Sequence, residues 1–192
     1  MRDIHPSEKL SPSYYEALGR VLVAFQALEE AVTYSVAQLT RTDKLEEVDL
    51  HYVFALSELP FRSRVKLLRN FLETTKPSHY LWKGCPAEEK RRKALTEMIS
   101  QLCEFVKGCN SLEDERNQIT HSTWEPSESG VEAIATRFKL RVQDKKTLVV
   151  REDIPQQRVM ELVERMQQSR IAIENISLLL VGFLAEKRKN AL

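Results

Sequence analysis

Three long stretches of this chain place apolar residues at alternating steps of three and four, and this rhythm constrains the fold more than any other feature. An α-helix turns once every 3.6 residues, so such residues line one face, which must be buried against other elements. The first stretch follows the helix-start signal Ser11-Pro12, the second starts at Glu88, and the third follows Pro155. Their apolar positions are, in order, Leu18, Leu22, Phe25, Leu28, Val32 and Val36; Leu95, Ile99, Leu102, Val106, Cys109 and Leu112; and Val159, Leu162, Val163, Met166, Ile173, Ile176, Leu180 and Phe183.

Two shorter helices are predicted between the first two long ones. The first helix is expected to end near Leu39, and residues 43–57 form the next helical candidate. Pro60 starts another, whose apolar stripe is Phe61, Val65, Leu68 and Leu72. Two prolines and a glycine between Thr74 and Pro86 predict a loop, with Trp82 packed over the core.

A β-hairpin is predicted between the second and third long helices. Apolar and basic residues alternate from Phe138 to Val142, residues 147–150 are β-prone, and residues 143–146 suit a turn. Residues 122–124 can start a further extended segment, and residues 153–156 match a capping box with Pro155 in the first helical turn. We therefore predict the all-α class, as a helical bundle of about five helices in a single domain, 1–192, with a small β-hairpin (about 122–150) inserted before the C-terminal helix.

The composition bounds the function without choosing it. With 42% hydrophobic and 30% charged residues, the chain resembles an ordinary soluble protein. The net charge of +1 provides no global basic field, so any contact with nucleic acid must come from a local patch. The longest apolar run, residues 176–185, is too short to span a bilayer. We expect a cytoplasmic protein with reduced thiols at Cys85, Cys103 and Cys109, the last two on or near an apolar helix face.

Several basic clusters are candidate contacts for an anion. The run Lys90–Lys93 is interpreted as a solvated helix start, although contact with an RNA backbone is the alternative. The basic residues after Pro60 are interpreted as an exposed helix face. The alternating cations of the first hairpin strand either face a phosphate chain or form the solvent face of a half-buried strand, and we favour the latter. These residues are Arg62, Arg64, Lys66 and Arg69, and then Arg137, Lys139 and Arg141.

The residues with the clearest chemistry are Arg116, Asn117 and His121, at the end of the helix that starts at Glu88. Histidine, with an ordinary pKa near 6.5, acts as a general acid or base at neutral pH. A guanidinium binds phosphate bidentately and stabilises its developing charge, and an amide orients a water, a phosphate or a ribose. Together these groups suit attack of a ribose 2′-hydroxyl on its own phosphate, without a metal or another cofactor.

Helix geometry limits how these residues meet. Residues five apart on a regular helix are separated by roughly 140° and about 7.5 Å of rise, so Arg116 and His121 do not share a face. Either the helix ends between them, or a second chain completes the site. Arg116 also falls on or beside the buried stripe, where its charge needs a partner: Glu113 one turn back, a ligand or a second subunit.

This stretch resembles the signature of the HEPN superfamily, in which an Arg, usually followed by a polar residue, precedes a His by four to six positions. Arg116, Asn117 and His121 match it with four intervening residues, and Thr123-Trp124 follows, as aromatic residues often do in similar proteins. The resemblance implies a helical bundle that acts as a homodimeric, metal-independent endoribonuclease in a toxin–antitoxin, phage-defence or CRISPR-linked setting. His121 is then the general acid or base, Arg116 the phosphate contact and Asn117 an orienting group.

Two other interpretations stay open. Some HEPN relatives bind nucleotides or only dimerise, so a non-catalytic module that binds an antitoxin or regulatory partner is the alternative function. In a purely structural interpretation, Arg116 pairs with Glu113 while His121 caps carbonyl groups at the helix end.

Overall fold

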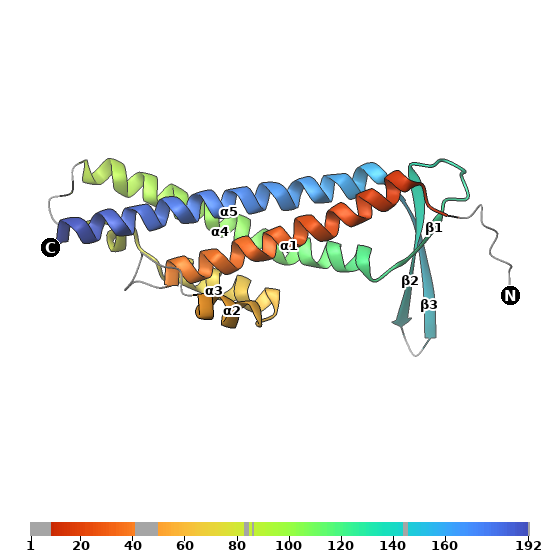
Figure 1. Cartoon of the computed structure of the whole chain (residues 1–192), viewed down its shortest axis with the longest axis horizontal. Coiled ribbons are helices and arrows are strands. Elements are labelled where there is room, and N and C mark those ends of the chain that lie inside the picture. The colour runs from red at the N-terminus through yellow and green to blue at the C-terminus, as the bar shows by residue number, and fades with distance from the viewer. Residues whose placement is uncertain (1–8, 41–49, 83–84, 86, 144–145, 192) are drawn as a thin grey trace. The chain divides into compact units, whose positions relative to one another are not determined.

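The structure, a computed structural model, describes residues 9–40, 50–82, 85, 87–143 and 146–191. The predicted fold class is confirmed: the chain is a helical bundle with a small antiparallel sheet before its last helix. The elements, labelled in Figure 1, are α1 (Pro12–Thr40), α2 (Leu50–Ser57), α3 (Phe61–Thr74), the 3-10 helix η1 (Pro77–Tyr80), α4 (Glu88–Thr120), β1 (Thr123–Pro126), β2 (Ile134–Gln143), β3 (Lys146–Pro155) and α5 (Gln156–Ala191).

Most predicted helix boundaries agree with these elements, because the apolar rhythm and the proline signals are local, whereas β2 and β3 each extend several residues beyond the predicted strand segments. Helices α1, α3 and α4 begin within one residue of their predicted starts. The extended segment after His121 is confirmed as β1, which pairs with β2 to add a third strand to the hairpin. The predicted loop at residues 74–86 contains η1. The predicted helix at residues 43–57 is observed as α2, and the first part of that prediction lies outside the described residues.

The chain divides into two compact units, and the three long helices contribute a segment to each of them. The sheet unit comprises Met1–Gln26 and Leu112–Met166, and the helical unit comprises Ala27–Ser111 and Gln167–Leu192. The sheet unit therefore holds the start of α1, the end of α4, the three strands and the start of α5. Its register places Thr123 opposite Phe138 and Gln143 opposite Lys146.

The core of the sheet unit corrects one part of the predicted stripe on α1. Leu22 was expected to be buried, but the residue is 47% exposed. The buried face follows Tyr14, Ala17, Val21 and Ala24, one position before the predicted leucines. Before Phe25, which belongs to both, the predicted and the observed stripes are offset by one residue. Both repeat at steps of three and four, so periodicity alone could not decide which of them is buried.

The predicted capping box before α5 is wrong. Strand β3 continues to Pro155, and α5 begins at Gln156. The carboxylate of Asp153 accepts hydrogen bonds from the hydroxyls of Thr136 at 2.5 Å and Ser127 at 3.0 Å. These hydroxyls hold the pKa of Asp153 below its usual value. Asp153 thus fastens β3 within the sheet unit instead of capping the helix.

Tyr14 connects α1 with the sheet and provides a test of this unit. Its hydroxyl donates a hydrogen bond to the carbonyl of Ile154 at 2.8 Å, and burial raises its pKa to about 12. An unfolded tyrosine ionises near pH 10. The contribution of the neutral Tyr14 side chain to the free energy of unfolding is therefore complete below about pH 10 and is lost as the pH rises to about 12.

Tyr14→Phe is therefore expected to lower the free energy of unfolding by about 1 kcal/mol at pH 7, the usual value of one such hydrogen bond. The variant should also lose less stability than the wild type between pH 10 and 12. Urea unfolding followed by circular dichroism at both pH values measures this. Tyr15→Phe, at an exposed neighbour, is the control, and an equal effect there would contradict the assignment.

The helical unit contains a buried ion pair that the sequence interpretation missed. Arg64 was expected on an exposed face, but the residue is 7% exposed. Its guanidinium donates to Glu29 Oε1 at 2.8 Å and to Thr33 Oγ1 at 2.7 Å, and it lies 5.8 Å from the ring centroid of Phe61. The partners come from α1, so a pattern confined to α3 gave no sign of them.

The basic run at the start of α4 also contains an exception. Lys90, Arg92 and Lys93 are exposed, as predicted for a solvated helix start. Arg91 instead pairs with Glu186 of α5 at 2.8 Å, and its guanidinium lies 5.3 Å from the ring centroid of Trp82. Trp82 is half-buried, so its predicted packing role is refined to a contact with this cation.

The three cysteines lie in the helical unit, and α5 contributes residues to both units. All three thiols are free, and burial raises the pKa of Cys109 to about 12, which agrees with the predicted apolar position. Helix α5 is buried along its predicted stripe except at the half-buried Phe183. By length and composition alone, α5 is also long and apolar enough to cross a membrane, a test that core helices of soluble proteins pass as well. The cytoplasmic location therefore stays a prediction.

Candidate functional site at the end of helix α4

Helix α4 remains regular through the motif. Its last residue is Thr120, and the backbone N–H of His121 still bonds to the carbonyl of Asn117 at 3.1 Å. The helix therefore ends at Thr120, between Arg116 and His121, but helical hydrogen bonding continues to the N–H of His121, so this end provides no break that would bring the two side chains onto one face. Arg116 and His121 are directed to different sides of α4.

Two side chains that follow the helix satisfy its last carbonyl groups. The hydroxyl of Ser122 bonds to the carbonyl of Gln118, and the indole Nε1 of Trp124 donates to the carbonyl of Ile119 at 2.9 Å. The indole ring also lies 5.7 Å from the ring of Tyr14, measured between centroids. Capping of these two carbonyls by His121, as in the purely structural interpretation, is therefore not observed.

Arg116 is fixed by contacts on two sides. Its guanidinium carbon lies 4.9 Å from the ring centroid of Phe25 in α1, within the range of a cation–π interaction. Its Nη1 donates to Oδ1 of Asn117 at 2.8 Å. The sequence interpretation proposed Glu113, a ligand or a second subunit as the partner of Arg116, and it did not foresee Phe25.

One donor of Arg116 has no partner. Its Nε is buried and makes no hydrogen bond with the described residues, as is also true of the Nε of Arg64 and of Arg69. An unsatisfied buried donor typically destabilises a protein by about 1–3 kcal/mol, so each case needs a cause such as a water, an ion or a ligand. The Nε side of a guanidinium is part of the fork that binds two oxygens of one phosphate or carboxylate.

His121 lies in different surroundings. It is exposed, and its imidazole makes no hydrogen bond or ion pair with the residues that the structure describes. Asn117 precedes it by one turn on the same face of α4, where residues four apart are neighbours. One copy of the chain therefore brings Asn117 together with each of the other two residues but does not bring Arg116 and His121 together.

A second arginine reaches the end of α4 from the sheet. Arg137 was interpreted as part of a solvent face, but it is 9% exposed, which corrects that interpretation. It bonds to Gln118 Oε1 at 3.2 Å and pairs with Glu152, which also pairs with Arg158 at 2.8 Å. These contacts join the last turn of α4 to both long strands. The alternation of β2 placed Arg137 on a face without showing that α4 and Glu152 would cover it.

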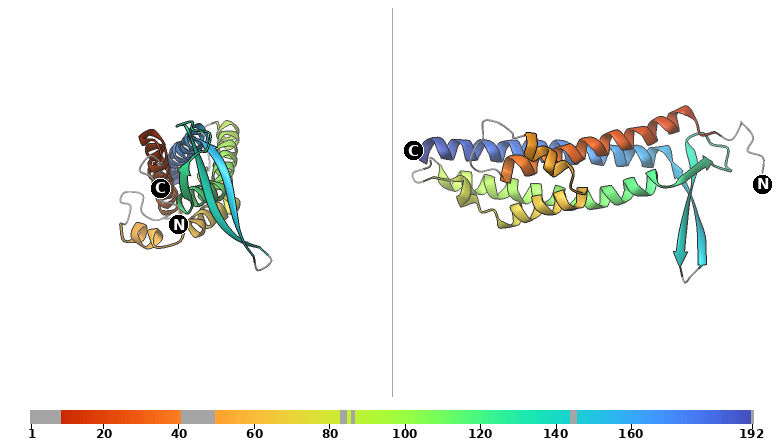
Figure 2. Two further views of the ribbon diagram at one scale, coloured as in Figure 1. Left: turned by 90° about the vertical axis from the view of Figure 1, so that its right-hand side faces the viewer. Right: turned by 60° about the horizontal axis from the view of Figure 1, so that its bottom comes forward.

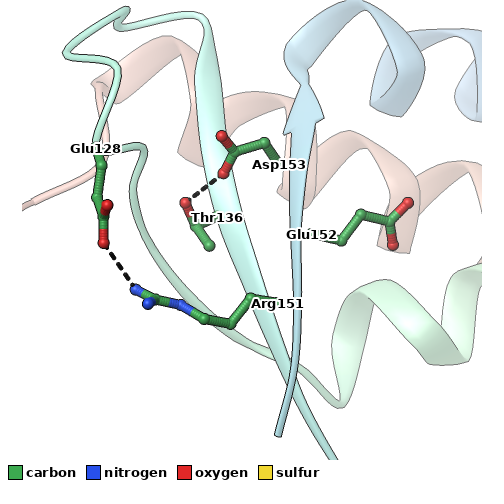
Figure 3. Close-up of a pocket in the computed structure, with 5 residues that line it drawn as sticks. All are labelled: Glu128, Thr136, Arg151, Glu152 and Asp153. Carbon is green, nitrogen blue, oxygen red and sulfur yellow. Dashed lines mark hydrogen bonds and ion pairs between the residues drawn. The ribbon is translucent and has the colours of Figure 1, made fainter.

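One pocket of the sheet unit lies apart from the motif. It has a volume of about 350 Å³ and is lined by Glu128, Thr136, Arg151, Glu152 and Asp153. Figure 3 shows Thr136 and Asp153 facing each other across the two long strands, and Arg151 paired with Glu128. Three carboxylates and one arginine give this lining a net negative charge, which disfavours a phosphate ligand.

Within the described parts of the chain, no three His, Cys, Asp or Glu residues are arranged to hold a metal ion. The sequence matches no known family model, no curated protein and no solved structure. The resemblance to the HEPN superfamily accordingly depends on Arg116, Asn117 and His121 and on the helical architecture.

Proposed function

We propose that this chain is a HEPN-type endoribonuclease that cleaves RNA without a metal, in a toxin–antitoxin or phage-defence setting. Arg116 binds the phosphate, Asn117 orients it, and His121 transfers a proton. Two copies of the chain form the site at a homodimer seam.

The observation that carries this proposal is the state of Arg116. Its guanidinium is held by Phe25 and Asn117, while its buried Nε has no partner. A fixed cation with an unused donor is a receptor for an oxyanion, and a phosphodiester offers two oxygens to it. The same charge stabilises the additional negative charge on phosphorus as the 2′-oxygen attacks.

His121 supplies the proton transfer in this scheme. As a base, its imidazole takes the proton of the 2′-hydroxyl; as an acid, it gives a proton to the leaving 5′-oxygen. The bond from phosphorus to the 2′-oxygen forms while the bond to the 5′-oxygen breaks. The products are a 2′,3′-cyclic phosphate and a 5′-hydroxyl.

The requirement for two copies follows from the regular end of α4. Because helical hydrogen bonding continues to the N–H of His121, the helical repeat directs Arg116 and His121 roughly 140° apart. A two-fold axis near the end of α4 would bring Arg116 of one copy towards His121 of the other. The exposure of His121 leaves it accessible to a partner copy and to RNA.

The second candidate function is a non-catalytic module that dimerises or binds a nucleotide or a partner protein. The different surroundings of Arg116 and His121 within one chain favour it. In that case Arg116 binds an anion, such as a nucleotide phosphate, and His121 takes no part in chemistry.

Incubation of total RNA with the protein in EDTA separates the two candidates. Wild type should produce fragments that end in 2′,3′-cyclic phosphate, and His121→Ala should cut at least about 10²-fold more slowly, the usual effect of losing a general acid or base. His79→Ala, at an exposed histidine of the helical unit, is the matched control and should retain full activity. If the RNA stays intact, or if His121→Ala cleaves it as fast as wild type, the proposed ribonuclease activity is rejected.

A further inference from the structure

Positive charge is concentrated on the two long strands. Between Phe138 and Arg151, the sequence has five Lys or Arg residues and one Asp, whereas the whole chain has a net charge of only +1. The five cations are Lys139, Arg141, Lys145, Lys146 and Arg151. A local patch of this kind is what a nearly neutral protein needs in order to bind a polyanion.

The backbone separates most of these cations from the rest of the sheet. Strand β1 pairs only with residues 135–138 of β2, so Lys139–Gln143 and Lys146–Val150 pair only with each other. We call this segment the β ribbon; Figure 2 shows it continuing past the end of β1. Five residue pairs give it a length of roughly 17 Å. A two-stranded ribbon is marginally stable in water by itself, so it gains from a binding partner.

One cation of the β ribbon differs from those at its base. At the base, Arg137 pairs with Glu152 and Arg151 pairs with Glu128, so both charges are compensated. Lys139 is half-buried and forms no ion pair with any residue that the structure describes. Lys139 therefore carries a positive charge that the described residues leave uncompensated.

The register places three cationic positions on one face of the β ribbon. Alternate residues of a strand lie on the same face, so positions 139, 141 and 143 share one. Gln143 is paired with Lys146, and directly opposed residues also share a face. Positions 139, 141 and 146 thus form a row along the ribbon, which matches the linear array of charges on a nucleic-acid backbone better than a point ligand.

We propose that the β ribbon binds the phosphate backbone of RNA through Lys139, Arg141 and Lys146. The choice of RNA rests on the proposed function. The ribbon continues from the part of β2 where Arg137 contacts Gln118, and β1 begins two residues after His121. RNA held by the ribbon is thereby directed to the end of α4.

Equilibrium binding of a fluorescein-labelled RNA hairpin to His121→Ala protein, over a series of salt concentrations, tests this. The variant Lys139→Thr/Arg141→Thr/Lys146→Thr keeps β-prone residues in the strands. It should bind more weakly, and the slope of log K against log salt should be shallower by roughly 2, because each single-strand phosphate contact contributes about 0.7. Lys139→Arg/Lys146→Arg keeps the charge and should bind like the parent protein.

The matched control removes the same charge elsewhere. Lys90→Gln/Arg92→Gln/Lys93→Gln changes three exposed cations at the start of α4 and should leave the slope unchanged. Circular dichroism confirms that each variant is folded; if the threonine variant does not fold, Lys139→Thr alone should still make the slope shallower by about 0.7. Equal slopes for the threonine variants and the parent, or no RNA binding by the parent, would overturn the inference. If RNA binding depends on the β ribbon but the wild-type protein does not cleave RNA, the inferred role of the ribbon is supported and only the proposed ribonuclease activity is rejected.

Discussion

Mixing the Arg116→Ala and His121→Ala proteins should restore about a quarter of the wild-type ribonuclease activity, although each variant alone is expected to lose about 10²–10⁴-fold. In a random mixture, half of the dimers contain one copy of each variant. If each site takes Arg116 from one chain and His121 from the other, such a dimer keeps one intact site of two. Initial rates of RNA cleavage in EDTA, measured after mixing and re-equilibration, test the expectation.

The result is specific to a shared site. Were both residues to act from the same chain, every site in the mixture would lack one group, and activity would stay at the level of the single variants. The double variant Arg116→Ala/His121→Ala, mixed with either single variant, is the control and should restore nothing. Native mass spectrometry verifies that mixed dimers form; mixed dimers without activity would exclude the two-chain site.

Glu29→Ala should lower the free energy of unfolding by about 2–3 kcal/mol. Removing one partner of a buried ion pair typically costs about 3–5 kcal/mol, because the other charge stays buried without compensation. We expect the lower value because the side chain of Glu29 is 30% exposed, whereas that of Arg64 is 9% exposed. Urea unfolding followed by circular dichroism at neutral pH gives the difference.

An exposed ion pair of α1 provides the comparison. Glu16 pairs with Arg20 at 2.6 Å, but both side chains are more than half exposed. Glu16→Ala should therefore change the free energy of unfolding by less than about 0.5 kcal/mol. Equal losses in the two variants would show that the burial of Arg64 has no energetic consequence.

The sequence predicted the elements well where the signal is local. The apolar rhythm of α1 and α4 depends on neighbouring residues, so the starts of both helices and the end of α1 were predicted to within one residue. Strands β2 and β3 were detected by the same local signal, but each extends several residues beyond its predicted segment. The predicted capping box failed because the carboxylate of Asp153 bonds to the hydroxyls of Thr136 and Ser127, which the fold brings to it. The residues next to Asp153 in the sequence gave no sign of these two hydroxyls.

The buried arginines also could not be predicted from neighbouring residues. Arg64 and Arg137 occupy positions that suit exposed cations, and their carboxylate partners, Glu29 and Glu152, come from other elements. At the candidate site, the sequence identified Arg116, Asn117 and His121 and their divergence on a helix. It gave no sign of Phe25, because one buried phenylalanine of α1 resembles any other core residue until the structure places it against Arg116.

The contact between Phe25 and Arg116 has a consequence for binding. An arginine side chain in solution has about 2 kcal/mol of rotamer entropy, most of which is lost when it grips a ligand. Here the ring of Phe25 and the amide of Asn117 impose that loss during folding, before any anion arrives. The guanidinium is preorganised, so a phosphate that binds to it meets donors that need no further ordering, and the cost of ordering them is already included in the free energy of folding.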